Sequence, residues 1–410
     1  MNNKTFYKNT ISLYLLRISY YLFSFITVPL QTRVLGPSIY ALLAFSLTFS
    51  QYFQVFVEFG FNLSATEKIS KNKDDKLFVN TMISKVLYSR ILLFIISLFI
   101  FLILIFIFPE FKKNVLILFI YFISAVVVAF LPDFLFMGLE QMQFITYKSV
   151  ISRAVFTVLL FMFLRNASLF YLVPIFSIMG NLLALFFICN YITNKLGYKL
   201  IKIPIRDIIN EIKWSSQFFF SQLSNSLYNT INTLTIGLVY GSNSVDLGLF
   251  KTADQSIFMG KQVIMPITDS LFPYMAKNKD FSLFKKIFIL GTVIIIIGTI
   301  FVDIYARELC GIIFGEKFIE SSLYLRLLSP SVLFAFWTMM FGYPLLSAIG
   351  KISYANYSII FSSIFQLVVL FVLLLTNKLN IVNLCILTCI SELLIFAFRL
   401  VVVLKYISNE

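Results

Sequence analysis

Long apolar runs separated by short polar segments dominate the chain. A helix needs about 20 mostly apolar residues to cross the hydrocarbon core of a bilayer. Runs of that kind lie near 11–32, 38–60, 84–108, 115–137, 148–164 and 170–192, and again near 217–240, 252–274, 286–305, 323–349, 354–376 and 382–404. The pattern predicts an all-α, polytopic membrane protein with about 12 transmembrane helices and no inserted soluble domain.

Composition agrees with this pattern and excludes one class of partner. Hydrophobic residues make up 60% of the 410 positions and charged residues only 13%, whereas soluble domains carry about 25% charged residues. The net charge is +14, but the basic residues stand between apolar runs and form no cluster with interleaved aromatics. Nucleic-acid binding is therefore not expected.

Basic residues predict the orientation of the helices, since cytoplasmic loops are enriched in Lys and Arg. If the N-terminus is cytoplasmic, that side holds Lys4, Lys8, Lys68, Lys71, Lys73, Lys76, Lys148, Lys195, Lys199, Lys202, Arg206, Lys213, Lys277, Lys279, Lys285, Lys286, Lys351 and Lys405. The opposite side holds fewer, so both termini are expected to be cytoplasmic. The longest cytoplasmic segment predicts an N-terminal six-helix bundle at 1–200, a connector at 201–216 and a C-terminal six-helix bundle at 217–410.

The two halves of the chain resemble each other weakly. Pro132 and Gly138 form a P-x5-G motif at the end of the fourth run, and Pro344 and Gly350 repeat it at the end of the tenth. The sequences YITN and YISN end the sixth and twelfth runs. Two pseudo-symmetric six-helix bundles, an arrangement typical of transporters, would explain these echoes. Accidental similarity between apolar segments is the alternative.

Polar side chains recur at helical spacing inside four of the runs. The stripes are Arg17, Tyr20, Ser24, Thr27 and Gln31 in the first run, Ser46, Ser50, Gln54 and Glu58 in the second, Gln222, Asn225, Asn229 and Asn232 in the seventh, and Asp254, Lys261 and Thr268 in the eighth. Such stripes line a hydrated cavity or hold helices together as polar contacts. Spacing alone leaves both interpretations open.

Two cations inside the runs suggest an anionic ligand. A Lys or Arg near the middle of a transmembrane helix costs about 2.5–3.5 kcal/mol, so it normally faces water or a partner. We therefore expect Arg17 and Lys261 to supply positive charge to a ligand, although Lys261 has Asp254 and Asp269 as alternative partners. Three further arginines lie near the ends of their runs and are expected to extend to the interface: Arg90, Arg153 and Arg399.

No motif of catalysis or cofactor binding is found in the sequence. The chain has no His, no P-loop, no GxGxxG loop, and four cysteines without a CxxC pair. We therefore expect neither an enzyme nor a metal or other cofactor. Without a nucleotide site, an ion gradient or the membrane potential would have to drive transport, and the candidate coupling carboxylates are Glu58, Asp133, Asp254, Asp269 and Glu392.

Several ordered motifs point to a family. They are R-x-LGP-x-x-Y at 33–40, followed by Ala41 where Gly is usual; VEFGFNLSATEKIS at 57–70; P-x5-G-x-E-x-M at 132–142; SQFFFSQLSNSLYNTINTLTIGLVYGSNSVDLGLF at 216–250; and FGEKFIESSLYLRLLSP at 314–330. In this order the motifs resemble those of the Wzx-type polysaccharide and O-antigen flippases of the multidrug/oligosaccharidyl-lipid/polysaccharide (MOP) exporter superfamily. The resemblance covers most of the chain.

The resemblance implies two six-helix bundles around a cationic cavity. It also implies a substrate: an undecaprenyl-pyrophosphate-linked oligosaccharide, moved from the cytoplasmic to the outer leaflet of a bacterial inner membrane during O-antigen or capsule assembly. A polysaccharide polymerase and a chain-length regulator are its candidate partners. Alternatives are a multidrug or cation exporter of the same superfamily and a membrane polysaccharide polymerase. The candidate substrate-binding residues are Arg17, Lys261, Tyr20, Ser24, Gln31, Gln54, Gln222, Asn225, Asn229 and Asn232.

Overall fold

The computed structural model describes residues 3–407, except the side chains of residues 3–10, 13 and 407. Lys4 and Lys8, which entered the predicted orientation, lie outside the described side chains. The described residues form helices joined by short turns, without a strand. They divide into two compact units, Met1–Ser226 and Leu227–Glu410, and the division falls inside α9 (Ile205–Tyr240).

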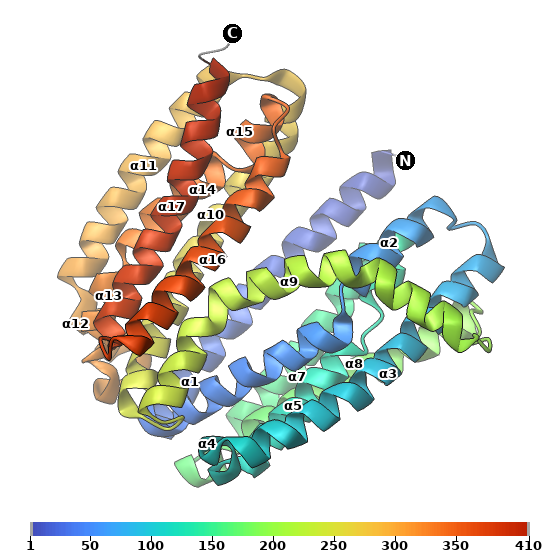
Figure 1. The fold of residues 1–410 in the computed structure, drawn as a ribbon, viewed down its shortest axis with the longest axis horizontal. Helices are drawn as coiled ribbons and strands as arrows, with labels where there is room; N and C mark the ends of the chain where they lie inside the picture. The colour runs from blue at the N-terminus through green and yellow to red at the C-terminus, as the bar shows by residue number, and fades with distance from the viewer. Residues whose placement is uncertain (1–2, 408–410) are drawn as a thin grey trace. The chain divides into compact units, whose positions relative to one another are not determined.

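The N-terminal unit is drawn from blue to green in Figure 1. Its helices are α1 (Asn3–Glu58), α2 (Phe61–Lys71), α3 (Lys76–Ile107), α4 (Pro109–Lys113), α5 (Val115–Ala129), α6 (Asp133–Gly138), α7 (Met142–Phe163) and α8 (Leu172–Asn190). A 3-10 turn (Ala167–Leu169) precedes α8 and a π-helical turn (Tyr191–Lys195) follows it. The first part of α9 completes this unit.

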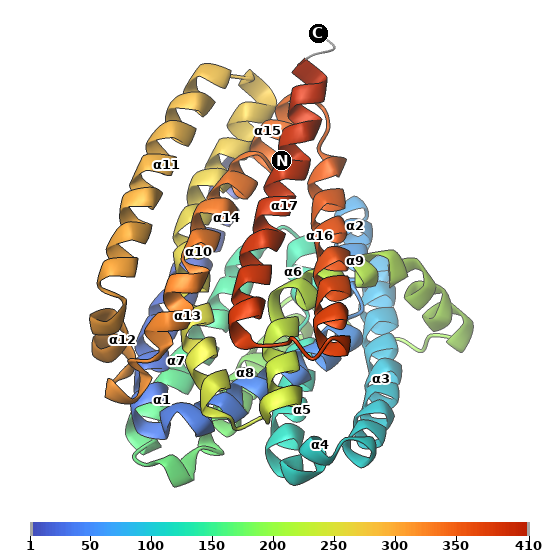
Figure 2. The same cartoon turned by 60° about the vertical axis from the view of Figure 1, so that its left-hand side comes forward.

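The C-terminal unit begins within α9 and continues to the end of the chain. Its other helices are α10 (Val245–Asn278), α11 (Phe281–Ile304), α12 (Ala306–Phe314), α13 (Ser321–Leu328), α14 (Pro330–Met340), α15 (Tyr343–Ala348), α16 (Ser353–Leu375) and α17 (Ile381–Ile407), with a 3-10 turn at Glu316–Phe318. Helix α11 runs along one edge of this unit (Figure 2) and, throughout its length, buries only Phe284.

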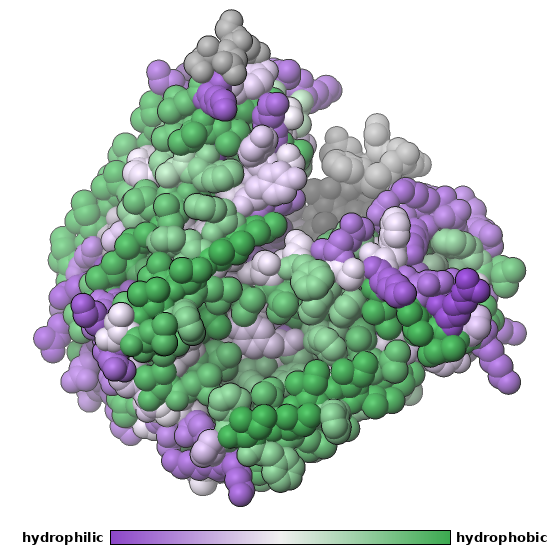
Figure 3. Space-filling view, viewed as in Figure 1, coloured by the Kyte–Doolittle hydropathy of each residue, from purple (hydrophilic) through white to green (hydrophobic). Residues whose placement is uncertain are grey.

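Nine helical segments in the described part of the chain are long and apolar enough to cross a membrane. The first, Tyr14–Lys71, covers two predicted spans at once, and α9 and α10, which carry polar stripes, are not among the nine. Apolar side chains cover much of the visible face of the C-terminal unit, with hydrophilic ones gathered near the helix ends (Figure 3). The prediction of an all-α, polytopic membrane fold is confirmed.

The LGP sequence after the first predicted span has a structural reason. Helix α1 is continuous except at Gly36, whose φ of 73° and ψ of 172° are not helical. A positive φ is accessible to Gly at little cost and is strained for most other residues. Pro37 follows and lacks the N–H that a continuous helix would use. The kink therefore separates the two predicted spans without a loop.

The family-like motif at 57–70 packs against the first half of α9, and the motif at 132–142 packs against the motif at 57–70. Phe59 stacks on Phe219 with ring centroids 4.4 Å apart, and the hydroxyls of Ser64 and Ser215 lie 2.7 Å apart. Gly138, at the end of α6, lies so close to α2 that an added Cβ would be 2.6 Å from Ile69 Cγ2. Small residues at these positions allow the helices to approach closely.

Gly60 gives a first testable prediction. Its φ is +74°, and a Cβ there would lie 2.6 Å from Phe218 Cβ and 2.8 Å from the Phe219 backbone nitrogen. We expect Gly60→Ala to lower the free energy of unfolding in detergent by about 3 kcal/mol, from backbone strain plus overpacking. Gly298→Ala is the control, because nothing lies within 4 Å of its added Cβ. Equal stability of the two variants would contradict the packing described here.

Each unit contains a broken helix held by a buried arginine. Arg90 Nη1 donates to Leu131 O at 3.0 Å, in the break between α5 and α6. Arg399 Nη1 donates to Thr338 O, just before the break between α14 and α15. A broken helix leaves carbonyls without partners, and hydrocarbon offers no donors. The prediction that Arg90 and Arg399 extend to the interface is wrong, since they are only 2% and 4% exposed.

The segment before α9 is attached to the N-terminal unit. The backbone N–H groups of Lys199 and Ile201 donate to Asn80 Oδ1 and Ser84 Oγ of α3, both at 2.9 Å. The extended stretch ends where α9 begins, at Ile205, so most of the predicted connector 201–216 is helical. Lys68 Nζ also lies 2.8 Å from a Glu211 carboxylate oxygen. These contacts fix the first turns of α9 to α2 and α3.

Candidate functional site

A hydrogen-bonded network links three helices of the N-terminal unit. Gln54 Nε2 donates to Glu58 Oε1 at 2.8 Å at the end of α1, and Asn62 Nδ2 of α2 lies 3.5 Å from Glu58 Oε2. Arg90 Nη2 of α3 donates to Asn62 Oδ1 at 3.1 Å. The structure thus brings two predicted site residues, Gln54 and Glu58, together with Arg90.

A buried ion pair joins α6 and α7 of the same unit. Lys148 is 6% exposed and its ammonium contacts the carboxylate of Asp133. Lys148, which the orientation argument assigned to the cytoplasmic side, thus lies inside α7 beside a carboxylate. Arg90, Lys148, Glu58 and Asp133 place two cations and two carboxylates within this unit, so their formal charges balance.

The predicted stripe in the first half of α1 has mixed surroundings. The Arg153 guanidinium of α7 lies 4.1 Å from the ring centroid of Tyr20, a cation–π contact. Tyr20 is 39% exposed, and Arg17, Ser24 and Gln31 are partly buried. Arg153 thus contributes a second cation close to the stripe, which sequence spacing did not indicate.

The second predicted stripe is only partly polar in its contacts. Ser46 and Ser50 are buried, and their hydroxyl oxygens have no hydrogen-bond partner among the described residues. Only Gln54 and Glu58, at the end of the stripe, join a network. The first half of the stripe therefore packs in the interior, where it offers little to a hydrated cavity.

In the C-terminal unit, Lys261 of α10 pairs with Glu392 of α17. The Lys261 ammonium lies 2.5 Å from Glu392 Oε1, and the two side chains are 19% and 8% exposed. Asp254 pairs instead with Lys251, at 2.6 Å one helical turn away. The predicted alternative in which Lys261 pairs with Asp254 is therefore wrong. Glu392, predicted only as a coupling candidate, holds the predicted ligand-binding cation.

The stripe on α9 divides between contact and exposure. Asn232 is buried: its Nδ2 donates to Thr388 Oγ1 at 2.9 Å, and its Oδ1 accepts from Gln366 Nε2 at 3.3 Å. Asn232 therefore holds helices together, while Asn225 and Asn229 are exposed and Gln222 is partly buried. Asp269 is exposed as well.

The fixed charges of the C-terminal interior are unequal. The Lys261 side chain is 19% exposed and Arg399 is 4% exposed. Glu392 is a carboxylate near both cations. Arg399 belongs to the same α17 helix and reaches α14 and α16 through hydrogen bonds. Positive charge therefore exceeds negative charge at this point, and an anion would be favoured there.

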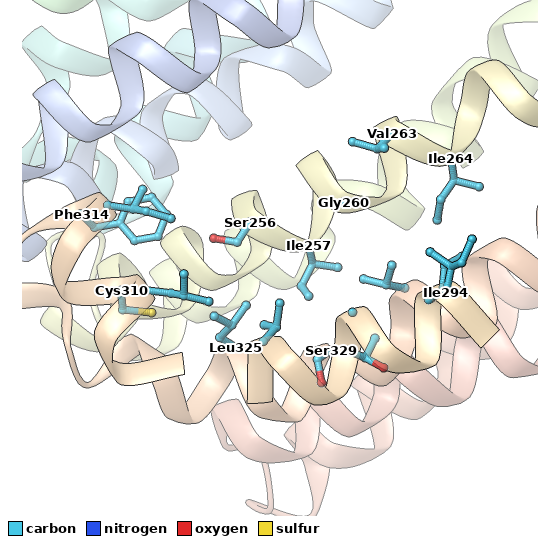
Figure 4. Close-up of a pocket in the computed structure, with 17 residues that line it drawn as sticks. Ser256, Ile257, Gly260, Val263, Ile264, Ile294, Cys310, Phe314, Leu325 and Ser329 are labelled. Carbon is cyan, nitrogen blue, oxygen red and sulfur yellow. The ribbon is translucent and has the colours of Figure 1, made fainter. Parts of the chain in front are cut away.

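An apolar cavity of about 420 Å³ lies elsewhere in the C-terminal unit. Side chains of α10, α11, α12 and α13 surround it, among them Ile257, Ile294, Phe314 and Leu325 (Figure 4). None of the residues predicted to bind substrate lines it. Its walls suit hydrocarbon, so it contributes nothing to a path for sugars. In the described part of the chain, no group of three or more His, Cys, Asp or Glu could hold a metal ion.

Sequence reasoning missed the arginines and amides that complete these networks. Arg90 and Arg399 were interpreted as interface residues because they lie near the ends of apolar runs, and Gln366 belongs to none of the predicted stripes. The available signal was Pro-x5-Gly: a helix that breaks inside the membrane needs donors for its freed carbonyls. The identity of those donors depends on tertiary packing.

Solved structures of membrane transporters share this fold. The fold is shared with a multidrug resistance MATE family transporter of the MOP superfamily (TM-score 0.70, 14% identity, 96% of this chain and 99% of that one). It is also shared with the lipid II flippase MurJ (TM-score 0.71, 13% identity, 96% and 87%). The fold therefore defines an α-helical membrane protein with the architecture of MOP superfamily transporters.

The family follows from the sequence match. Residues 6–279 match the model of the family described as "Polysaccharide biosynthesis protein", and the chain belongs to that family. It is 26% identical over 277 residues to a candidate O-antigen transporter of Escherichia coli (strain K12), covering 68% of this chain and 66%, just under two thirds, of that protein. A Shigella dysenteriae relative with the same description is 24% identical over 288 residues, 68% and 70% of the two chains. The resemblance to Wzx-type members of the MOP superfamily is confirmed.

Proposed function

We propose that the protein is a flippase that moves an undecaprenyl-pyrophosphate-linked oligosaccharide from the cytoplasmic to the outer leaflet of a bacterial inner membrane. Family membership supports a role in polysaccharide assembly, and relatives are described as O-antigen transporters. The observation that carries the choice of an anionic substrate is the excess of buried cations around Glu392. Both termini are proposed to be cytoplasmic, because more basic residues lie on that side of the predicted spans.

The physical task explains why transport needs such residues. A pyrophosphate and its sugars carry charges and hydroxyls that hydrocarbon cannot solvate, and each unpaired hydroxyl costs about 2–7 kcal/mol. Lys261 and Arg17 are proposed to attract the pyrophosphate, and the amides of Gln222, Asn225 and Asn229 to exchange hydrogen bonds with the glycan. The isoprenoid tail remains in the bilayer. A polymerase and a chain-length regulator are proposed to act on the flipped product.

Reconstitution of the purified chain in liposomes tests this proposal. A fluorescent undecaprenyl-pyrophosphate-linked oligosaccharide is placed in both leaflets, and a membrane-impermeant quencher reports the fraction that changes leaflet. Flipping above protein-free liposomes is expected. Transport of cationic dyes with no movement of the lipid-linked sugar would favour a multidrug exporter. Elongation of the sugar chain would favour a polymerase.

Arg17 gives a second prediction. Arg17→Gln removes a positive charge from the first half of α1, and we expect flipping to fall about tenfold, equivalent to about 1.4 kcal/mol of lost attraction for the pyrophosphate. Arg33→Gln, on the same helix at an exposed position, should retain the rate of the unmodified protein. Both variants should insert and unfold normally. Equal rates for the two would remove Arg17 from the proposed substrate contacts.

A further inference from the structure

A second cavity, of about 550 Å³, lies within the N-terminal unit. It is bounded by α3, by the break between α5 and α6, by the end of α8 and by the extended segment at 198–200. Most of its walls are apolar, including Val86, Leu87 and Phe134, but Arg90 and Lys199 also line it and no carboxylate does. The cavity therefore combines a surface for hydrocarbon with positive charge.

One guanidinium nitrogen of Arg90, a residue that lines this cavity, has no hydrogen-bond partner among the described residues. Its two Nη atoms donate to Leu131 O and Asn62 Oδ1, and its Cζ lies 5.3 Å from the centroid of the Phe134 ring. Its Nε is buried and has no hydrogen-bond partner among the described residues. Arg90 is 2% exposed. The cavity wall thus carries a buried cation and no carboxylate, which favours an anion there.

The other end of the cavity is basic and ordered. Lys199 and Thr193 are exposed there, and Lys76 lies with its Nζ 6.0 Å from the centroid of the Tyr198 ring. Asn80 and Ser84 hold the backbone of this segment against α3. A basic end beside an apolar interior matches the two parts of an anionic lipid, whose phosphate needs cations and whose acyl chain needs apolar walls.

We propose that this cavity is a binding site for an anionic phospholipid of the surrounding bilayer. One acyl chain lies along Val86, Leu87 and Phe134, and the phosphate lies at Lys199 and Thr193. The positive charge of Arg90, in the cavity wall, attracts the ester and phosphate oxygens. The bound lipid stabilises the segment at 198–201, which leads into α9. Binding does not depend on the flippase activity proposed above.

Native mass spectrometry of the full-length protein in detergent tests the site. Phosphatidylglycerol should be retained more strongly than phosphatidylcholine. Lys199→Gln should weaken phosphatidylglycerol binding about fivefold, the effect expected for one basic residue near an anionic lipid. The matched control is Lys202→Gln, an exposed lysine that does not line the cavity. Equal loss in both variants would overturn the proposal.

A second pair of variants tests the apolar part. Leu87→Trp places a large ring in the cavity and should reduce retention about tenfold or more, while Ile95→Trp, exposed on the same helix and outside the cavity, should not. If Leu87→Trp fails to fold, Lys199→Gln still decides. Undecaprenyl phosphate serves as the competing lipid: preferential retention of it over phosphatidylglycerol would assign the cavity to the substrate lipid and overturn the proposal.

A native cysteine provides an independent measurement. Cys189 lines the cavity and is exposed, whereas Cys310 and Cys385 are buried. Phosphatidylglycerol should slow the alkylation of Cys189 by a maleimide at least about threefold relative to phosphatidylcholine, as read by peptide mass spectrometry. The Lys199→Gln variant should lose this protection. Identical alkylation rates in the two lipids would contradict binding at this cavity.

Discussion

Lys261→Met should destabilise the protein by about 3–5 kcal/mol, because it leaves Glu392 buried without its cation. The Lys261 ammonium lies 2.5 Å from Glu392 Oε1, and the Glu392 side chain is 8% exposed. Thermal unfolding in detergent measures the loss. Lys251→Met is the matched control: its partner Asp254 lies one turn away on the same helix and is 29% exposed, so the loss there should be below about 1 kcal/mol. Similar losses would show that the Lys261 pair is solvated.

The double variant Lys261→Met/Glu392→Gln separates structure from transport. Removing both charges should restore most of the stability, since Glu392 is then no longer a buried carboxylate without its ammonium partner. If Lys261 also attracts the pyrophosphate, the stable double variant should still flip the lipid-linked oligosaccharide at least about tenfold more slowly than the unmodified protein. A double variant that is stable and fully active would reduce Lys261 to a structural role.

The hydrophobic pattern predicted the large-scale fold because membrane insertion is decided locally. The predicted spans coincide with helical segments; the first two share α1, and the LGP sequence marks the kink at Gly36 between them. Each P-x5-G motif coincides with a short helix, α6 for the first and α15 for the second. These features depend on residues close together in the chain, where periodicity and the special backbone of Gly and Pro carry the information.

Side-chain contacts between different helices were not predictable. The spacing of residues along a helix shows which side chains share one face of it, but not which other helix packs against that face. Lys261 had two carboxylates on its own helix and yet pairs with Glu392, 131 residues away. Asn232 belonged to a stripe expected to bind substrate, but Gln366 and Thr388 occupy its amide. Arg90 and Arg399 were misplaced for the same reason: the carbonyls they satisfy come from breaks in other helices.

The motif residues that identified the family hold the fold. Gly315 has a φ of 100°, which favours glycine, and Phe318 is fully buried. Ser321 Oγ donates to Leu249 O at 2.6 Å, and Ser329 Oγ donates to Asp303 Oδ1 at 2.6 Å. A motif built from such contacts identifies the architecture while leaving the substrate unspecified.

Arg399→Lys should lower the free energy of unfolding of the C-terminal unit by about 2–4 kcal/mol, the largest expected loss after that of Lys261→Met. Its guanidinium donates from Nε to Ser358 Oγ and from Nη2 to Ala355 O, both at 2.9 Å, and from Nη1 to Thr338 O. These acceptors belong to two helices, α14 and α16. The single ammonium of Lys cannot reach all three positions, so buried acceptors would lose their donors. Thermal unfolding in detergent and the yield of inserted protein measure the effect.

Arg153→Lys is the control for this substitution, because Arg153 is partly exposed and contacts Tyr20 by a cation–π interaction that Lys can also make. Its loss should stay near 1 kcal/mol or below. Gly342→Ala should reproduce much of the Arg399→Lys effect, since an added Cβ would lie 2.4 Å from Arg399 Nη1. If both Arg399→Lys and Gly342→Ala were as stable as Arg153→Lys, the freed carbonyls of the broken helix would have to be satisfied by water, and the C-terminal unit would be hydrated at the level of that break.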